Sequence, residues 1–411
     1  MKRYPLLTLT QLLLFSCSNA GAPGVSSYSE ESIDYSQPFT LKMYAEYAYV
    51  PFLQSQCDAY VREFQLDGKV RIEVGDVPTP MSFEDVDLLI IGQSGLSGLQ
   101  WERDFVKISP NYLNRVKAEF DPTCLNQVTV GEDIYAFPFY LSSYAFLYDS
   151  SLLSAEDIHT FSSLKEAVNR LPGDRLAYYD YANYWYMDAF FSSYDVQVRY
   201  AKENGTWKLA RDDMGTEKAK RALYDLAPMI QNEALFTDDF HIFSSEPFFA
   251  DPQKRARLTA GVFGIDQYLG IKETFGDSLA FAPMPVAEST PSLPYRQTSL
   301  AVRRQENASK AAEAMRLANY LTSAASMSSF VREIPMLPAN LPAQKNAEDP
   351  FVKALAKNFT TGYVTNFIFD EDFYTAYLRL LKSVSALEEG FPMDELDPLL
   401  EEFESTLHGE E

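Results

Sequence analysis

The order of predicted strands and helices near the start of the chain constrains its fold more than any other feature. Residues 39–44 alternate apolar and polar side chains as a strand does, and Pro51 opens a helical stretch that runs to Phe64. Residues 70–74 alternate strictly, and residues 86–91 form a continuous apolar run of the kind found in buried parallel strands. This order predicts an α/β fold in which helices cover both faces of a mostly parallel sheet.

Helix and turn signals continue through the rest of the chain. Ser163 and Glu166 have the spacing of a capping box and predict a helix that ends at Leu171. The dipeptide Asn204-Gly205 predicts a hairpin. Apolar residues at helical spacing predict further helices over residues 308–331, 371–385 and 393–407.

The first residues have the pattern of an export signal. Lys2 and Arg3 precede an apolar run, residues 4–15, that is too short to span a bilayer. The sequence Leu14-Phe15-Ser16-Cys17 resembles a bacterial lipobox, which implies cleavage before Cys17 and lipid modification of its thiol. An ordinary cleaved signal followed by a chance cysteine is the alternative.

The residues after the signal are small and polar, as a flexible tether requires. We therefore expect a signal peptide over residues 1–16 and a tether over residues 17–37. The mature protein would be an extracytoplasmic lipoprotein, in the periplasm or at the cell surface, that touches the membrane only through its lipid anchor.

Charge and composition exclude several classes of function. The chain has 411 residues with 35 Lys+Arg and 58 Asp+Glu, a formal net charge of −23, whereas a nucleic-acid partner requires a basic surface. This charge favours a neutral or cationic ligand. Only 3 His and 3 Cys are present, so we expect no metal, no cofactor and no His-based triad. Cys57 and Cys124 could form a disulfide or lie buried as free thiols.

Two motifs in the middle of the chain carry a family resemblance. Residues 130–138 read Val-Gly-Glu-Asp-Ile-Tyr-Ala-Phe-Pro, and residues 146–149 read Phe-Leu-Tyr-Asp. Together with the order of elements over residues 39–407, they resemble the extracellular solute-binding proteins of ABC importers, the type that includes maltose-binding protein. The resemblance implies the periplasmic-binding-protein type II fold, in which two α/β lobes close on a small solute by a hinge, here near Tyr140–Tyr144.

The same resemblance implies how the chain divides between the lobes. Lobe 1 would contain residues 38–141 and 284–340, and lobe 2 would contain residues 142–283 and 341–408. The protein would act as a monomer, with the permease subunits of an importer as its partners.

Ligand contacts are expected in loops at the carboxyl ends of strands. Aromatic faces there would cover the apolar side of a sugar or heterocycle, and carboxylates, amides and hydroxyls would bind its polar rim. The candidates are Glu46, Tyr47, Tyr49, Gln93, Ser94, Tyr140, Ser142, Asn183, Trp185, Tyr186, Phe263, Asp266, Gln267 and Tyr295. Trp185 and Tyr186 match the position where sugar-binding relatives present stacking aromatics.

A second resemblance points to an enzyme with the same fold. Residues 46–51, Glu-Tyr-Ala-Tyr-Val-Pro, look like the opening motif of thiaminase I, which uses a Cys nucleophile and a Glu base. Ser142 or Ser143 stands where that Cys belongs, and Gln267 takes the position of the Glu, with Asp266 adjacent. An unactivated hydroxyl is a much weaker nucleophile than a thiolate.

We therefore expect a non-catalytic binding protein that delivers a small organic solute to an ABC importer. A carbohydrate is the favoured ligand, and a thiamine-like heterocycle is the alternative. Thiaminase-like activity through Ser142 is the competing function.

Overall fold

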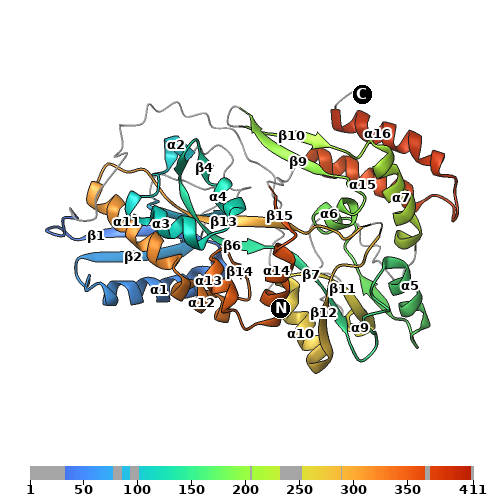
Figure 1. The fold of residues 1–411 in the computed structure, drawn as a ribbon, viewed down its shortest axis with the longest axis horizontal. Coiled ribbons are helices and arrows are strands. Elements are labelled where there is room, and N and C mark those ends of the chain that lie inside the picture. The colour runs from blue at the N-terminus through green and yellow to red at the C-terminus, as the bar shows by residue number, and fades with distance from the viewer. Residues whose placement is uncertain are drawn as a thin grey trace, which may run out of the picture.

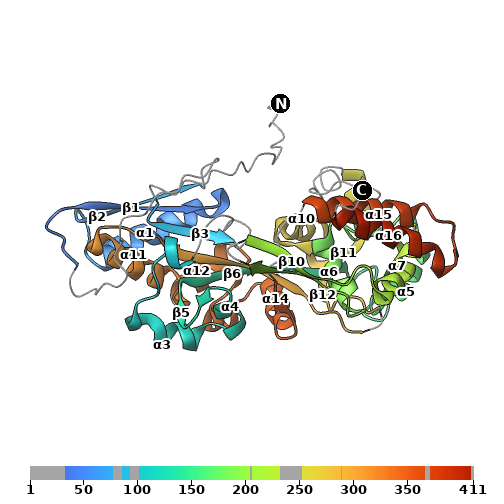
Figure 2. The ribbon, with the colours of Figure 1, turned by 90° about the horizontal axis from the view of Figure 1, so that it is seen from above.

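The computed structural model describes residues 33–76, 86–92, 101–203, 206–231, 252–287, 289–365 and 371–408. The chain forms two α/β lobes that lie side by side along the long axis of the molecule (Figure 1), each built on its own sheet. The view from above shows the same two lobes (Figure 2). How residues divide between them, 38–141 with 284–340 and 142–283 with 341–408, stays a prediction, although residues 363–364 pair with residues 294–295 in the first sheet.

The first sheet has seven strands in the order β14-β6-β13-β3-β1-β2, and β15 pairs with β13. The strands are β1 (Phe39–Ala45), β2 (Val70–Asp76), β3 (Leu88–Gly92), β6 (Ala136–Ser142), β13 (Pro294–Val302), β14 (Leu337–Pro338) and β15 (Tyr363–Val364). The helices of this lobe are η2 (Tyr47–Tyr49), α1 (Val50–Glu63), α2 (Trp101–Asp104), α3 (Pro110–Glu119), α4 (Pro122–Asn126), α11 (Ala308–Leu321), α12 (Ala324–Glu333) and α13 (Leu341–Lys345), with the short pair β4 (Thr129–Val130) and β5 (Asp133–Ile134).

The second sheet has four strands in the order β12-β7-β11-β8. These are β7 (Tyr144–Asp149), β8 (Leu176–Tyr178), β11 (Leu258–Gly264) and β12 (Leu279–Ala282), and β9 (Val198–Glu203) pairs separately with β10 (Thr206–Asp212). The helices of this lobe are α5 (Phe161–Arg170), α6 (Tyr184–Ser192), α7 (Glu217–Ile230), α9 (Pro252–Arg257), α10 (Ile265–Phe275), η4 (Gly276–Ser278), α15 (Glu371–Ser385), η5 (Met393–Leu396) and α16 (Asp397–His408). Helix α14 (Pro350–Phe359) contacts strands of both sheets.

The sheets are more mixed than the expected mostly parallel arrangement. Strand β1 runs parallel to β2 and β3, as predicted from the opening of the chain. Strand β13, however, runs antiparallel to both β3 and β6, and β11 runs antiparallel to β7. The physical reason is that β7 and β13 enter their sheets from the other lobe, so no crossover helix within the same sheet forces them to run parallel.

The structure corrects two local predictions, the capping box of α5 and the single Ala-rich helix, and confirms a third, the antiparallel pair of strands. The capping box of α5 is formed by Thr160 and Ser163, whose side chains each accept the other's backbone N–H at 3.0 Å, rather than by Ser163 and Glu166. The Ala-rich segment forms α11 and α12 instead of one helix, because Asn340 and Arg115 donate to the carbonyl of Thr322 where α11 ends. Strands β9 and β10 pair antiparallel, as the hairpin prediction requires, and the predicted turn residues Asn204 and Gly205 lie outside the described residues.

Much of the aromatic content lies in the core. The largest fully buried side chains are all Tyr or Phe, among them Tyr60, Tyr295 and Tyr377. Their hydroxyls donate to Glu313, to the carbonyl of Leu355 and to the carbonyl of Tyr181. Buried tyrosines are tolerated here because each of these hydroxyls has an acceptor. Cys57 and Cys124 are also buried, and both are free thiols.

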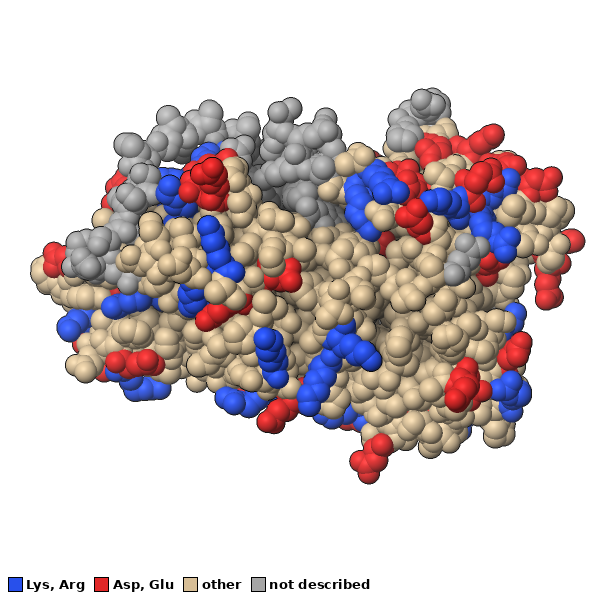
Figure 3. Space-filling view, viewed as in Figure 1, with Lys and Arg blue, Asp and Glu red and all other residues tan. Residues whose placement is uncertain are grey.

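Charged side chains of both signs are interspersed over the visible surface of both lobes (Figure 3). Within the part of the chain that the structure describes, helices fall short of the length and apolar character that a bilayer span demands.

The segments that pass between the sheets are hydrogen-bonded to one another. Ser143 alone separates β6 from β7, and its buried Oγ donates to the carbonyl of Pro294 at 2.6 Å, where the chain has returned to the first sheet. In the returning segment, the Oγ of Ser292 donates to the carbonyl of Thr361 at 2.7 Å, just before β15. We call Ser143, residues 289–294 and residues 361–363 the crossing segments.

Gly362 allows two of these segments to lie in contact. A Cβ at this position would lie 2.5 Å from the ring of Tyr295 and 2.9 Å from the carbonyl oxygen of Leu293. Only glycine lacks this atom, so the approach of β15 to β13 depends on it.

We predict that Ser143→Ala lowers the free energy of unfolding by about 1–3 kcal/mol, because the carbonyl of Pro294 loses a buried donor. Urea denaturation followed by circular dichroism measures this. Ser142→Ala is the matched control, since the neighbouring Oγ is only half-buried and lies 3.5 Å from its acceptor. Equal effects of the two substitutions would contradict the prediction.

Candidate functional site

Aromatic and amide side chains gather where α6 meets both sheets. Asn183 is the N-cap of α6 and accepts the backbone N–H of Trp185 at 3.1 Å. This cap favours a helix start at Tyr184 and places Trp185 and Tyr186 on the first turn. Both rings are half-buried and pack against the ring of Tyr144 in β7, at centroid distances of 5.7 and 5.3 Å.

Gln267 and Tyr374 complete this group from the second lobe. The Gln267 Oε1 accepts the backbone N–H of Gly264 at 2.8 Å, and its amide lies 3.3 Å from the hydroxyl of Tyr186. The hydroxyl of Tyr374 in α15 lies 3.4 Å from the Oδ1 of Asn183.

Arg296 reaches this group from β13 of the first sheet. Its guanidinium carbon lies 4.1 Å from the centroid of the Trp185 ring, a cation–π contact between the two lobes. Arg296 is exposed to solvent, yet desolvation by surrounding protein lowers its pKa. We call the set Tyr144, Asn183, Trp185, Tyr186, Gln267, Arg296 and Tyr374 the Trp185 cluster.

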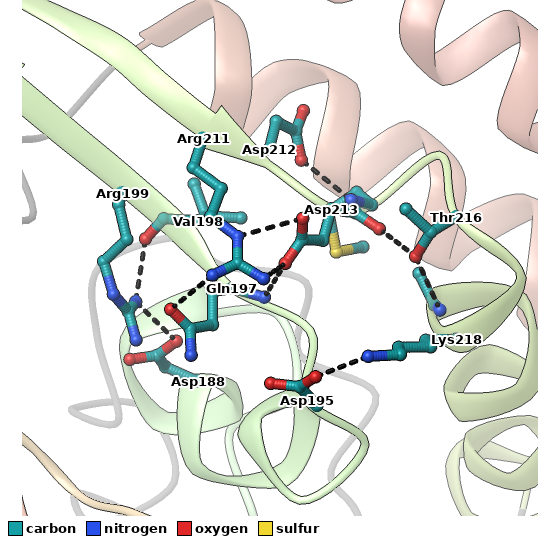
Figure 4. A network of polar contacts seen from close by, with 12 residues as sticks. Asp188, Asp195, Gln197, Val198, Arg199, Arg211, Asp212, Asp213, Thr216 and Lys218 are labelled. Atoms are coloured by element: carbon teal, nitrogen blue, oxygen red, sulfur yellow. Dashed lines mark hydrogen bonds and ion pairs between the residues drawn. The ribbon is translucent and has the colours of Figure 1, made fainter.

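A buried charge network lies beside the cluster. The carboxylate of Asp188, in α6, is 3.5 Å from the Nη1 of Arg199 in β9, and the two side chains point toward one another in Figure 4. The hydroxyl of Tyr363, in β15, donates to the other oxygen of Asp188, and the guanidinium of Arg199 lies 4.2 Å from the Tyr363 ring centroid. Tyr363 belongs to the first sheet, so this network also joins the lobes.

The charge of Asp188 is stabilised by its partners against a large cost of burial. Desolvation raises the pKa of Asp188, and the charge of Arg199 and the hydrogen bond from Tyr363 oppose that rise. Desolvation likewise raises the pKa of Tyr363, which keeps its hydroxyl protonated as a donor. The pair Asp188–Arg199 therefore contributes little net charge to the neighbouring site.

Asp180 lies between β8 and α6 and is also buried. Desolvation raises the pKa of Asp180 to about 7, although backbone N–H groups of Asn183 and Ala182 favour the charged form. Desolvation raises the pKa of Tyr374, a member of the Trp185 cluster, and the nearby charge of Asp180 adds to that rise.

The predicted ligand residues fall into distinct environments. Asn183, Trp185, Tyr186 and Gln267 come together in the Trp185 cluster, and Ser142 pairs in β-sheet register with Arg296. Glu46 and Tyr47 are exposed after β1, Tyr47 by 78%. Gln93, Ser94 and the side chain of Asp266 lie outside the described residues.

Four predicted ligand residues lie in the core in this structure. Tyr49 and Tyr140 pack edge to face at 5.4 Å, and Tyr140 also stacks on Phe330. Phe263 stacks on Tyr178 at 5.7 Å, and Tyr295 is fully buried. Side chains alternate between the two faces of a strand, so it is the neighbouring Arg296, and not Tyr295, whose side chain contacts Trp185.

The residues expected for thiaminase chemistry are not arranged for it. The buried hydroxyl of Ser143 is bound to Pro294, and Ser142 Oγ makes only a 3.5 Å contact with a backbone carbonyl. Gln267 is an amide whose oxygen is bound to Gly264, so it cannot act as a general base. Among the described residues, no group of three or more His, Cys, Asp or Glu side chains could hold a metal ion.

Two α/β lobes, short crossing segments and an aromatic cluster where the lobes meet define a binding protein for a small solute. The chain belongs to the bacterial extracellular solute-binding proteins, whose family profile matches residues 64–360. Membership confirms the predicted family and the expectation of a binding protein rather than an enzyme. The sequence matches no curated protein.

Solved structures with the same fold cover most of the chain. The maltodextrin-binding protein of L. casei is 16% identical, with a TM-score of 0.70 over 90% of this chain and 99% of its own. The maltose-binding protein of Listeria monocytogenes, in complex with maltose, is 16% identical with a TM-score of 0.67 over 90% and 98%. The maltotriose-binding protein of Thermus thermophilus is 15% identical with a TM-score of 0.67 over 90% and 99%. These likenesses confirm the periplasmic-binding-protein fold.

We predict that Tyr363→Phe lowers the free energy of unfolding by about 1–3 kcal/mol, because a buried carboxylate loses a donor. Thermal and urea denaturation measure the change. Tyr112→Phe is the control, since the buried hydroxyl of Tyr112 has no hydrogen-bond partner among the described residues and its removal leaves no group unsatisfied. An unchanged free energy of unfolding in Tyr363→Phe would contradict the assigned network.

Asp180 makes stability depend on pH. Its folded pKa, about 7, lies above the ordinary 3.8, so the native state binds more protons between these values. The contribution of Asp180 to the free energy of unfolding is therefore largest in acid, and it is lost as the pH rises from about 4 to about 7. We predict that Asp180→Asn is more stable than the wild type at pH 8 by roughly 2–4 kcal/mol, and that the difference shrinks toward pH 4. Urea titrations at each pH test this, and a pH-independent difference would contradict it.

Proposed function

We propose that the protein captures a carbohydrate at the Trp185 cluster and delivers it to the permease subunits of an ABC importer. The observation that carries this proposal is the cluster itself: half-buried Trp185 and Tyr186 rings lie beside the amides of Asn183 and Gln267. Aromatic faces with amides at their rim match the apolar faces and hydroxyls of a sugar. The solved structures of the same fold named above bind maltose and maltodextrins, which supports a sugar as the ligand class.

The position of the cluster supports lobe closure around the ligand. Its members come from β7, α6, α10 and α15 on one side and from β13 on the other. A solute bound there would contact both lobes at once, and the short crossing segments would serve as the hinge. Arg296 also disfavours the alternative ligand, because a cationic thiamine would meet a guanidinium at the ring it needs for cation–π binding.

Sugar binding predicts a specific effect of truncating the tryptophan. We expect Trp185→Ala to weaken the tightest-binding sugar at least about tenfold, measured by titration calorimetry over a panel of mono- and oligosaccharides with thiamine included. Tyr224→Ala is the matched control, because this half-buried ring of α7 packs against Phe391. Turnover of thiamine, or saturable binding of thiamine alone, would overturn the carbohydrate assignment.

We further propose that Cys17 carries the lipid that anchors the protein outside the cytoplasm. This proposal rests on the lipobox-like sequence Leu14-Phe15-Ser16-Cys17 and on the polar residues that follow it. Cys17→Ala should move the protein from the membrane to the soluble fraction, whereas Cys57→Ala should leave it at the membrane. Membrane association of Cys17→Ala would refute the anchor.

A further inference from the structure

The side-chain amide of Asn183 offers a solute only one of its two ends. Its Oδ1 accepts the backbone N–H of Trp185 at 3.1 Å and a longer bond, at 3.4 Å, from the hydroxyl of Tyr374. An amide oxygen has two lone pairs, so both already face a donor of the protein. The bond from a backbone N–H also identifies this end of the amide as the oxygen. The Nδ2 end, with its two N–H donors, is the end that remains for a ligand.

The Nδ2 of Asn183 reaches solvent without a partner in the protein. Among the residues that the structure describes, it donates to no acceptor, and it is not one of the buried polar atoms that lack a partner. The indole Nε1 of Trp185, two residues later and also half-buried, has the same two properties. Both groups can donate hydrogen bonds and cannot accept them. The start of α6 therefore presents two donor groups to a solute.

The carboxylates beside this turn are already engaged within the protein. Asp188 is paired with Arg199 at 3.5 Å and accepts the hydroxyl of Tyr363. The buried carboxylate of Asp180 accepts the backbone N–H of Asn183. A sugar hydroxyl that accepts from Nδ2 would therefore find neither carboxylate open to its own hydrogen. An oxygen that carries no hydrogen makes no such demand.

The orientation of the Asn183 amide is set before a ligand binds. Its backbone N–H is bound by Asp180, and its Oδ1 caps the first turn of α6. The side chain could turn its oxygen toward a solute only by giving up this cap. A donor that is fixed in this way distinguishes an oxygen that accepts from a group that must donate.

We propose that Asn183 is a specificity-determining residue whose Nδ2 donates to a sugar oxygen that carries no hydrogen: a ring oxygen, a glycosidic oxygen or an acetamido carbonyl. This inference rests on the proposed function and names the oxygen chemistry that the site selects. The indole N–H of Trp185 binds a second acceptor of the same sugar.

Two substitutions that preserve the helix cap test the inference. Aspartate and serine cap a helix about as well as asparagine, so Asn183→Asp and Asn183→Ser should melt within about 2 °C of the wild type. Titration calorimetry would use the neutral sugars glucose, N-acetylglucosamine, maltose and maltotriose. We expect Asn183→Asp to weaken the tightest-binding of these at least about tenfold, because a carboxylate cannot donate to a hydrogen-free oxygen and repels its lone pairs. Asn183→Ser withdraws the donor without adding a negative charge and should weaken it by about three- to tenfold.

The sugar pairs distinguish the possible sources of this oxygen. Tighter wild-type binding of maltose than of glucose, with the difference lost in Asn183→Asp, assigns a glycosidic oxygen. The same pattern for N-acetylglucosamine against glucose assigns the acetamido carbonyl. An equal loss of affinity for every sugar, glucose included, assigns the ring oxygen.

The outcomes separate this inference from the function on which it rests. A hydroxyl could reverse its hydrogen bond toward the new carboxylate, so binding by Asn183→Asp within about twofold of the wild type would overturn the inference and leave carbohydrate capture standing. A wild type that binds none of the four sugars would contradict both. If a variant unfolds, the wild type still decides, because the side-chain amide resonances of Asn183 should shift in nuclear magnetic resonance spectra when the sugar is saturating. Unchanged resonances would overturn the inference.

Discussion

The hydrogen bonds among the crossing segments are the constraint on which the rest of the structure depends. Ser143 donates to Pro294, and Ser292 donates to Thr361, so the strands that leave and enter each sheet are held to one another rather than to the lobes alone. The crossing segments are short, so they fix where β7 and β13 begin. Gly362 lets β15 pack against β13 without a steric clash. Because α6 packs on β7 and Arg296 lies on β13, the geometry of the Trp185 cluster follows from these contacts.

Electrostatic pairing next to the crossing segments explains how charged groups can be buried between the lobes. Asp188 is neutralised by Arg199 and hydrogen-bonded by Tyr363, and removal of Arg199 would leave an unpaired buried carboxylate that costs several kcal/mol. Arg296 joins the lobes in a second way, because its guanidinium packs on the face of the Trp185 ring.

Local patterns predicted the fold well, and long-range contacts limited the prediction of the site. The strand–helix–strand order predicted β1, α1, β2 and β3, and the cap at Asn183 and the neighbouring rings predicted the Trp185 region. The contact of Arg296 with Trp185 was not predicted, although the two-residue period of a strand places Arg296 on the face opposite to Tyr295. Asp188 and Tyr363 are 175 positions apart, so their contact leaves no trace in local sequence. The same limit explains the antiparallel entry of β13, which depends on pairing with strands far away in the chain.

The central claim is that a solute bound at the Trp185 cluster bridges both lobes and closes them about the crossing segments. Small-angle X-ray scattering, with and without a saturating sugar identified by calorimetry, tests this most directly. The account predicts a smaller radius of gyration in the presence of the sugar, and no such change when Trp185→Ala is mixed with the sugar at the same concentration. A wild-type protein that binds the sugar fully while its radius of gyration stays the same would contradict it.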